Sequence, residues 1–305
     1  MTEIVVISGK GGTGKTSLTA ALAALWERPV IADCDVDAAD LHLLLAPTVR
    51  ESHQFFGGAK ARIEPDRCTD CGTCDLVCRF QAIHVSGGAG ETSRHIDAVD
   101  CEGCGLCAHC CPNHAILLEP QLSGEWFRSE TRFGPLLHAR LSAAQENSGK
   151  LVALLRHEAR QVAQDVAAAA ILVDGPPGIG CPVISSLSGA DYAVIVTEPT
   201  VSGFEDLKRA AELARHFRIP TGLVINKADL NPSVAQRIRV HAADEAFDQL
   251  GEIPYDQSVT WAQVKGLTVV EACPGSLAAA VRGIADNLRQ AVGRRRPVFA
   301  VVREG

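Results

Sequence analysis

The sequence predicts an α/β protein with a mostly parallel sheet covered by helices, interrupted by a separate cysteine-rich module. Over most of the 305 residues, short apolar runs alternate with longer helix-like stretches, which is the pattern of parallel strands buried between helices. The alternation stops between about residues 60 and 118, where Cys, Asp and Gly are frequent. We therefore expect a discontinuous domain, residues 1–59 and 119–305, with residues 60–118 inserted in one of its loops.

The elements of the discontinuous domain follow in chain order. Ile4–Ile7 is a continuous apolar run that leads through a glycine-rich turn into a helix-like stretch, residues 15–26, and a second strand, residues 30–32. Strands buried on both faces show no alternation, so continuous apolar runs identify the others, at 170–173, 192–196, 222–225 and 249–253. Helices are expected at 151–166, 203–217, 233–246 and 276–292.

The composition narrows the class of protein. An apolar fraction of 47% and a charged fraction of 21% are those of a folded globular chain and exclude disordered or fibrous classes. The net charge of −7 argues against a dedicated nucleic-acid binder. The sequence shows no signal-peptide pattern and no apolar run of about 20 residues. We expect a cytoplasmic protein without stable membrane association, whose twelve cysteines include metal ligands rather than disulfides.

A phosphate-binding loop follows the first strand. Residues 9–16, Gly-Lys-Gly-Gly-Thr-Gly-Lys-Thr, fit the pattern G-x-x-x-x-G-K-[ST] between a strand and a helix. In such a loop the backbone amides and the helix N-terminus hold phosphates, the lysine reaches the terminal phosphates, and the hydroxyl after it binds Mg²⁺. Lys15 and Thr16 take these two roles here. The predicted nucleotide contacts are Gly9, Gly11, Gly12, Thr13, Gly14, Lys15, Thr16 and Ser17.

A second lysine, Lys10, narrows the type of loop. The run resembles the deviant loop K-G-G-x-G-K-[ST] of the MinD/Mrp/nitrogenase-iron-protein superfamily, the SIMIBI type of P-loop NTPase. The resemblance implies that Lys10 reaches across a homodimer interface to the partner's nucleotide. It also implies that Asp35, in the first switch, orients or activates the attacking water, with Asp33 nearer the metal. The plain alternative for Asp35 is a helix N-cap.

Two further segments resemble the same superfamily. Residues 174–178, Asp-Gly-Pro-Pro-Gly, are similar to its Walker B motif and second switch, which implies that Asp174 holds Mg²⁺ through water and that the Gly178 amide meets the γ-phosphate. Asn226 resembles an adenine-contacting asparagine. The sequence Asn-Lys-Ala-Asp that it opens also suggests a guanine site, and we prefer adenine and therefore ATP because the other motifs favour the ATPase branch.

The cysteine-rich module contains an internal repeat. Residues 68–83 align with residues 101–116, with seven of sixteen positions identical, and each half contains the spacing C-x₂-C-x₂-C-x₃-C. This run resembles that of bacterial two-cluster ferredoxins, which implies an α+β ferredoxin-like domain with two [4Fe-4S] clusters and an exchanged fourth ligand. The alternative of two zinc sites fits triple runs poorly. The implied ligands are Cys68, Cys71, Cys74 and Cys111 for cluster 1, and Cys101, Cys104, Cys107 and Cys78 for cluster 2.

The remaining cysteines do not fit a metal-ligand spacing with another cysteine. We expect packed thiols at Cys34, Cys110 and Cys273. Cys181 lies seven residues after Asp174, as does the cysteine of the nitrogenase iron protein that binds a cluster between two subunits. A second ligand is not evident in the sequence, so we favour a buried structural thiol at Cys181. An inter-subunit metal site there stays open as the alternative.

The chain as a whole resembles MinD-superfamily P-loop ATPases that contain an inserted ferredoxin domain. The resemblance implies a slow Mg²⁺-dependent ATPase, dimeric with ATP bound, that couples dimer switching to electron transfer toward an unidentified redox partner. One alternative is an Mrp-type carrier that assembles clusters for an apo-metalloprotein. Another is a membrane-positioning ATPase, because residues 277–292 are amphipathic and precede the basic residues 294–296. We interpret that stretch as the last helix of the sheet domain.

Overall fold

The computed structural model describes residues 1–87, 93–142 and 148–294. The chain forms two compact units. The first comprises Met1–His53, Trp126–Leu141 and the described residues from Ser148 onward. The second comprises Gln54–Glu125, and it contains the whole of the predicted insert. Each unit is treated by itself below.

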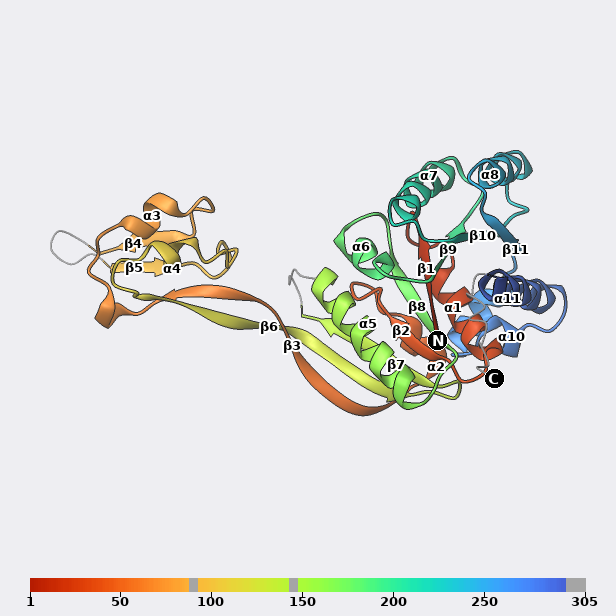
Figure 1. Ribbon diagram of the computed structural model, residues 1–305, viewed down its shortest axis with the longest axis horizontal. Coiled ribbons are helices and arrows are strands. Elements are labelled where there is room, and N and C mark those ends of the chain that lie inside the picture. The colour runs from red at the N-terminus through yellow and green to blue at the C-terminus, as the bar shows by residue number, and fades with distance from the viewer. Residues whose placement is uncertain (88–92, 143–147, 295–305) are drawn as a thin grey trace, which may run out of the picture. The chain divides into compact units, whose positions relative to one another are not determined.

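The first unit is built on a mostly parallel sheet with the strand order β11-β10-β9-β1-β8-β2-β7-β6-β3 (Figure 1). Its central strands pair in parallel, and each strand that the apolar runs predict is confirmed. Because parallel strands end at the same edge, the loops after β1, β2, β8, β9 and β10 share one edge of the sheet. The bounds are β1 Thr2–Ser8, β2 Val30–Asp33, β8 Ala170–Pro177, β9 Tyr192–Thr197, β10 Thr221–Asn226 and β11 Asp248–Ile253.

Three strands of the nine-stranded sheet are not evident in the sequence: β3 (Thr48–Ile63), β6 (Ile116–Glu130) and β7 (Pro135–Leu141). β3 and β6 are long and mostly exposed or half-buried, so they show no continuous apolar run. A turn joins β6 to β7, where the Thr131 N–H donates to the Gly134 carbonyl at 3.0 Å. β3 and β6 also continue from the first unit into the second, and they are the two connections of the predicted insertion.

The helices of the first unit form two packed groups (Figure 1). In one, α1, α2, α10 and α11 pack on Ile4, Val6 and their neighbours. Side chains alternate along a strand, so Val5 and Ile7 face the other side, where α5 to α8 pack. The predicted helices are confirmed within a few residues. The bounds are α1 Lys15–Leu25, α2 Leu41–Leu45, α5 Ser148–Asp165, α6 Cys181–Leu187, α7 Val201–His216, α8 Pro232–Asp244, α9 Ser258–Val264, α10 Val269–Ala272 and α11 Ser276–Arg294.

The C-terminal helix α11 buries an apolar stripe in this core, as expected for the last helix of the sheet domain. Within the described ranges, no helix is both long and apolar enough to cross a membrane. The basic stretch that the sequence analysis places after this helix lies outside the described residues beyond Arg294.

The second unit repeats one local fold. The short helices α3 (Thr73–Val77) and α4 (Leu106–Cys110) each begin after a glycine in the left-handed region, Gly72 and Gly105, both with φ of 77°. The two helices pack against each other, and β4 pairs antiparallel with β5. The small core contains the side chains of Cys74 and Cys101. The remaining bounds are η1 Pro65–Arg67, β4 Ile83–Ser86 and β5 Ser93–Ile96.

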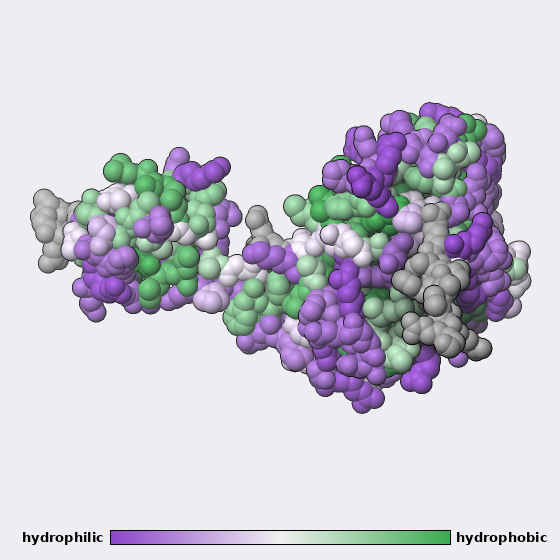
Figure 2. Space-filling model, in the orientation of Figure 1, coloured by the Kyte–Doolittle hydropathy of each residue, from purple (hydrophilic) through white to green (hydrophobic). Residues whose placement is uncertain are grey.

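The surface of the second unit mixes apolar with polar side chains, as Figure 2 shows. Leu76 is 89% exposed and Val99 is 86% exposed. Exposed apolar side chains in a unit of this size provide surface that a protein partner can cover. The others among the described residues are Phe56, Val85, Leu106, Leu117, Leu118 and Leu122.

Candidate functional site

The phosphate loop connects β1 to α1, and glycine is required at two of its positions. Gly14 has φ of 94°, and a Cβ there would lie 2.4 Å from the Asn226 Nδ2 atom. A Cβ on Gly9 would lie 2.4 Å from the carbonyl oxygen of Asp206 on α7. The loop leads into the first turn of α1, where no side chain caps the amides. Such a terminus favours an anion.

Lys15 lies inside the loop and is only 5% exposed. Its Nζ atom forms an ion pair with Asp35 Oδ2 at 3.5 Å. Burial raises the pKa of Asp35, and the charge of Lys15 opposes part of that rise. The structure thus brings together the predicted phosphate lysine and the predicted water-activating carboxylate, from two loops at one edge of the sheet.

Asp174 is fully buried on β8 and faces the first turns of α1. Its Oδ1 atom accepts a hydrogen bond from the Thr19 hydroxyl at 3.2 Å, and the Thr16 hydroxyl also hydrogen-bonds this carboxylate. Its Oδ2 atom is buried without a partner. Burial raises the pKa of Asp174 to about 6. A buried carboxylate with an unpaired oxygen and a neighbouring hydroxyl fits a Mg²⁺ site, because Mg²⁺ prefers oxygen ligands.

Asp33 stabilises the backbone that follows β2. Its carboxylate accepts the N–H groups of Asp35 at 3.3 Å and Leu41 at 3.1 Å, so it fixes the segment between β2 and α2. Burial, and then the nearby Asp174 charge, hold the pKa of Asp33 well above its usual range. The residue before α2 is Asp40, so the N-cap alternative for Asp35 does not match the observed helix start.

Lys10 is held within its own chain. Its Nζ atom lies 2.7 Å from Glu198 Oε1 and donates to the hydroxyls of Thr200 and Ser202 at 3.3 and 3.2 Å. Lys227 binds the other oxygen of Glu198 at 2.9 Å. Burial raises the pKa of Glu198, but the hydrogen bonds from the two lysines outweigh it and lower that pKa overall. Glu198 and Lys227 are not among the predicted site residues, although both directly follow strands that end at this edge.

The second switch differs in two details from expectation. The Gly178 N–H donates to the Ser8 carbonyl at 2.9 Å, so it does not point freely toward a phosphate. Cys181, the first residue of α6, is exposed. The expectation of a buried structural thiol at Cys181 is therefore wrong, because the helix turns this side chain away from the core. By contrast, Cys34 and Cys273 are buried, as expected for packed thiols.

A cavity of about 250 Å³ adjoins the phosphate loop. Asn226 lines it, and its Nδ2 atom donates to the Thr13 carbonyl at 2.8 Å. Ser17 also lines it and accepts a hydrogen bond from Gln263 at 2.8 Å. Its size and its place beside a phosphate loop suit a nucleoside. The part of the cavity wall that follows β11 was not predicted from the sequence. It includes Pro254, Tyr255, Asp256 and Gln263.

The eight clustered cysteines line two separate cavities in the second unit. The fourth cysteine of each run lines the cavity of the other run, which matches the exchange that the ferredoxin resemblance implies. All eight thiols are free of disulfides. Four thiols around each small cavity form a donor set that fits an iron–sulfur cubane. One cavity is lined by Cys68, Cys71, Cys74 and Cys111, the other by Cys78, Cys101, Cys104 and Cys107.

The thiols differ in their electrostatic surroundings. A hydrogen bond with the Thr73 side chain lowers the pKa of Cys71. Burial raises the pKa of Cys74 to about 11, with the Asp75 carboxylate adding to the rise, and burial also raises the pKa of Cys107. The Ala115 N–H donates to Cys111 Sγ at 3.3 Å. Backbone donors of this kind stabilise a thiolate ligand.

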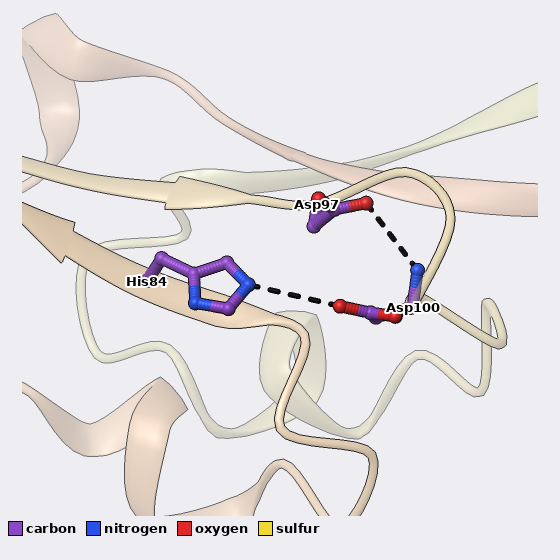
Figure 3. A group of neighbouring side chains, drawn as sticks. All are labelled: His84, Asp97 and Asp100. Atoms are coloured by element: carbon purple, nitrogen blue, oxygen red, sulfur yellow. Dashed lines mark hydrogen bonds and ion pairs between the residues drawn. The ribbon is translucent and has the colours of Figure 1, made fainter.

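A third group of polar side chains lies at the end of β5 (Figure 3). The ligand atoms of His84, Asp97 and Asp100 lie within 4.8 Å of one another. Asp97 accepts N–H groups of the turn that follows it, from Val99 at 2.6 Å and Asp100 at 3.4 Å. These hydrogen bonds account for the position of the Asp97 carboxylate. The Asp97 carbonyl also accepts the Cys101 N–H at 3.0 Å. We therefore interpret Asp97 and Asp100 as parts of the turn that leads the chain into its second cysteine run, with His84 of β4 beside them.

Comparison with known proteins identifies the nucleotide-binding fold. Residues 4–269 match the CobQ/CobB/MinD/ParA nucleotide binding domain family. The chain belongs to this family. Its nucleotide-binding domain is thus of the MinD/ParA type, and this domain contains the phosphate loop, Lys15, Asp35 and Asp174.

Individual relatives agree with this family. The chain is 33% identical over 232 residues to the uncharacterized protein MJ0578 of Methanocaldococcus jannaschii, and the match covers 75% of this chain and 79% of that protein. Its fold is similar to that of MinD from Pyrococcus horikoshii, solved with Mg-ADP, with a TM-score of 0.57 and 19% identity, covering 98% of this chain and all of that one. It is also 39% identical over 59 residues to pyruvate synthase subunit PorD of Thermotoga maritima, 19% of this chain and 57% of that protein.

Proposed function

We propose that this family member is a Mg²⁺-dependent ATPase that couples nucleotide-driven homodimer switching to electron transfer through two [4Fe-4S] clusters. The observation that carries the proposal is the presence, in one chain, of a buried Lys15–Asp35–Asp174 phosphate site and two cavities lined by four cysteines each. The strands β3 and β6 connect the two units covalently, so a change at either can be passed along the chain.

The hydrolytic step follows from the residues of the phosphate site. Lys15 now pairs with Asp35, and we propose that it moves to the terminal phosphates of ATP. Asp35 is then free to accept a proton from the attacking water, a role helped by its raised pKa. Water attacks the γ-phosphorus, the bond to the β-phosphate oxygen breaks, and ADP and phosphate result. Thr16 and Asp174 would hold Mg²⁺, which neutralises charge on the phosphates.

The cavity beside the loop favours adenine over guanine. Guanine recognition by an Asn-Lys-x-Asp sequence requires its aspartate to face the base. Asp229 does not line the cavity, and its carboxylate accepts the Tyr255 N–H at 2.7 Å. Asn226 remains at the cavity wall. We therefore propose ATP as the nucleotide.

Replacing Lys10 tests the proposed homodimer. Lys10 contacts Glu198, Thr200 and Ser202 in the single chain, and in the proposed dimer it leaves them for the partner's nucleotide. Lys10→Ala is expected to leave ATP affinity nearly unchanged and to lower ATP turnover by roughly 100-fold, as for loss of one charge that stabilises a transition state. Nucleotide titration and phosphate release measure the two effects.

The control for Lys10→Ala is Lys208→Ala. Lys208 is a half-buried lysine on α7 that pairs with the nearby Glu205 and lies over the Phe204 ring. The Lys208→Ala variant should keep normal turnover. Unchanged hydrolysis in Lys10→Ala, or an equal loss in both variants, would sink the proposed role across the dimer.

The redox part of the proposal rests on the cysteine cavities. Cys68, Cys71, Cys74 and Cys111 would hold one cluster, and the other four the second. When bound, the clusters supply one-electron chemistry. The short likeness to PorD and the exposed apolar side chains of the same unit support a protein redox partner.

Electron paramagnetic resonance tests the coupling. Anaerobically purified, dithionite-reduced protein is compared with and without MgATP. Cubane signals that change with MgATP are expected, because dimer closure alters the surroundings of the clusters. Cubane signals that do not respond to nucleotide would contradict the coupling, and absence of such signals would contradict the clusters.

Cluster assembly is the alternative function. One cysteine of each set, Cys71 and Cys104, is exposed, so an acceptor protein could reach the bound cluster. Rapid transfer of iron and sulfide to an apo-ferredoxin, dependent on MgATP, would favour the carrier. Clusters that stay bound through many ATP turnovers would favour electron transfer.

A further inference from the structure

The two cysteine cavities are related by the sequence repeat but differ in charge. At the repeat offset of 33 residues, Arg94 corresponds to Ala61. Arg94 lines the cavity of Cys68, Cys71, Cys74 and Cys111, and Ala61 lines the other. Apart from cysteine, Arg94 is the one ionisable residue in the first wall as described, and Glu102 is the one in the second. Charged groups also lie just outside these walls: the Asp75 carboxylate lies 3.5 Å from Cys74 Sγ, and the Lys60 ammonium donates to the Cys101 carbonyl.

Arg94 is fixed in place from three sides. Its side chain is 14% exposed, its Nε atom donates to Asp75 Oδ2 at 2.8 Å, and its Nη1 atom donates to the Asp70 carboxylate and, at 3.0 Å, to the Asp70 carbonyl. A Cβ at Gly72 would lie 3.3 Å from Nη2. The guanidinium thus packs on the loop that connects Cys71 and Cys74.

The second cavity lacks this ionic group. The counterparts of Asp70 and Asp75 at the repeat offset are Gly103 and Ala108. At Gly103 a Cβ would lie 1.9 Å from the Ala59 carbonyl oxygen, so backbone fills the space there. The Arg94 ion pairs are therefore specific to one half of an otherwise repeated structure.

We propose that Arg94 raises the reduction potential of the cluster bound by Cys68, Cys71, Cys74 and Cys111. The inference rests on the proposed function. Reduction adds one electron to a cluster, and a fixed positive charge stabilises the added negative charge, while Glu102 has the opposite effect at the other cavity. Arginine stays protonated at any working pH.

The two carboxylates that hold Arg94 are themselves negative charges near the cluster. Together, Asp70 and Asp75 exceed the single positive charge of the guanidinium. Replacing Arg94 by Gln removes the cation and leaves both carboxylates without their partner. Both changes make the nearby cluster harder to reduce, so its potential must fall.

Voltammetry of the cluster-loaded full chain tests the inference, because it reports potentials independently of ATPase activity. Wild-type protein should show two one-electron steps. In Arg94→Gln one step should shift to lower potential and the other should stay. In Glu102→Gln the step that Arg94→Gln leaves unchanged should shift upward. Arg62→Gln, the same charge change at an exposed residue paired with Glu119, should move neither step comparably.

Arg94→Lys separates charge from structure. Lysine keeps the charge but loses the fork that binds Asp70 and Asp75, so the step that Arg94→Gln lowers should stay near its wild-type potential. If Arg94→Gln does not retain its cluster, Asp75→Asn makes the opposite charge change in the same ionic group, and it should raise one step and leave the other.

Four results would overturn the inference: equal shifts of both steps in Arg94→Gln, no shift, a shift of one step to higher potential, or the same shift in Arg94→Lys. Wild-type protein without iron–sulfur signals would overturn the proposed function and this inference with it. Two clusters with potentials indifferent to residue 94 overturn the inference alone.

Discussion

Replacement of Lys15 by Ala is expected to lower MgATP hydrolysis by about 100- to 1000-fold, the range seen when one preorganised electrostatic contact is removed from an active site. Lys15 is the buried cation of the phosphate loop, and its partner Asp35 is the proposed proton acceptor. Loss of the ammonium removes the charge that meets the terminal phosphates. It also leaves Asp35 without the positive charge that opposes the rise of its pKa. Phosphate release measures the effect.

The measurement requires that the variant is folded. Circular dichroism of Lys15→Ala establishes this, nucleotide titration reports its ATP binding, and Lys208→Ala serves again as the charge-matched control. Normal hydrolysis by folded Lys15→Ala would refute the assignment of the phosphate site. Weak ATP binding with a retained fold agrees with it, because the same lysine contributes to binding and to turnover.

Replacement of Cys111 by Ala should remove one cluster and leave the other. Cys111 follows the second cysteine run but lines the cavity of the first. Two cubanes contain about eight iron atoms per chain, so the variant should retain about four. Iron and sulfide analysis of protein reconstituted without oxygen gives the count, and zinc analysis of the same sample tests the alternative metal.

The neighbouring cysteine provides a matched control. Cys110 lines neither cavity, so Cys110→Ala should retain both clusters. Cys78→Ala should lose the other cluster, because Cys78 lines the cavity of the second run. Equal iron contents in the variants of Cys110 and Cys111 would contradict the exchanged ligands, and a full complement of zinc would contradict the clusters.

Much of the fold could be predicted because its signals are local. The central strands are continuous apolar runs such as Ile4–Ile7, and burial on both faces of the sheet requires them to be apolar. The long strands β3 and β6 could not be found in this way. They are exposed along much of their length, so no side-chain period marks them, and backbone pairing with neighbours specifies them.

The candidate site likewise contains residues that local sequence signals predicted and residues that they did not. Motif spacing predicted the phosphate loop, the family resemblance implied Asp35 and Asp174, and the structure brings them together. Neither predicted Glu198, which holds Lys10 and Lys227, or the cavity wall around Tyr255. These residues belong to no motif. They meet only because separate strands end at one edge of a parallel sheet.

Short spacings along the sequence specify the glycine-rich loop and the repeated cysteine runs, and continuous apolar runs specify the parallel-sheet class. Only the folded chain brings distant groups together. It paired Lys15 with Asp35, turned Cys181 to the surface, and placed Arg94 beside one cysteine cavity and Ala61 beside the other. The physical reason is that a spacing of a few residues is fixed by local backbone geometry. The charge and burial that a side chain meets depend on segments far away in the chain.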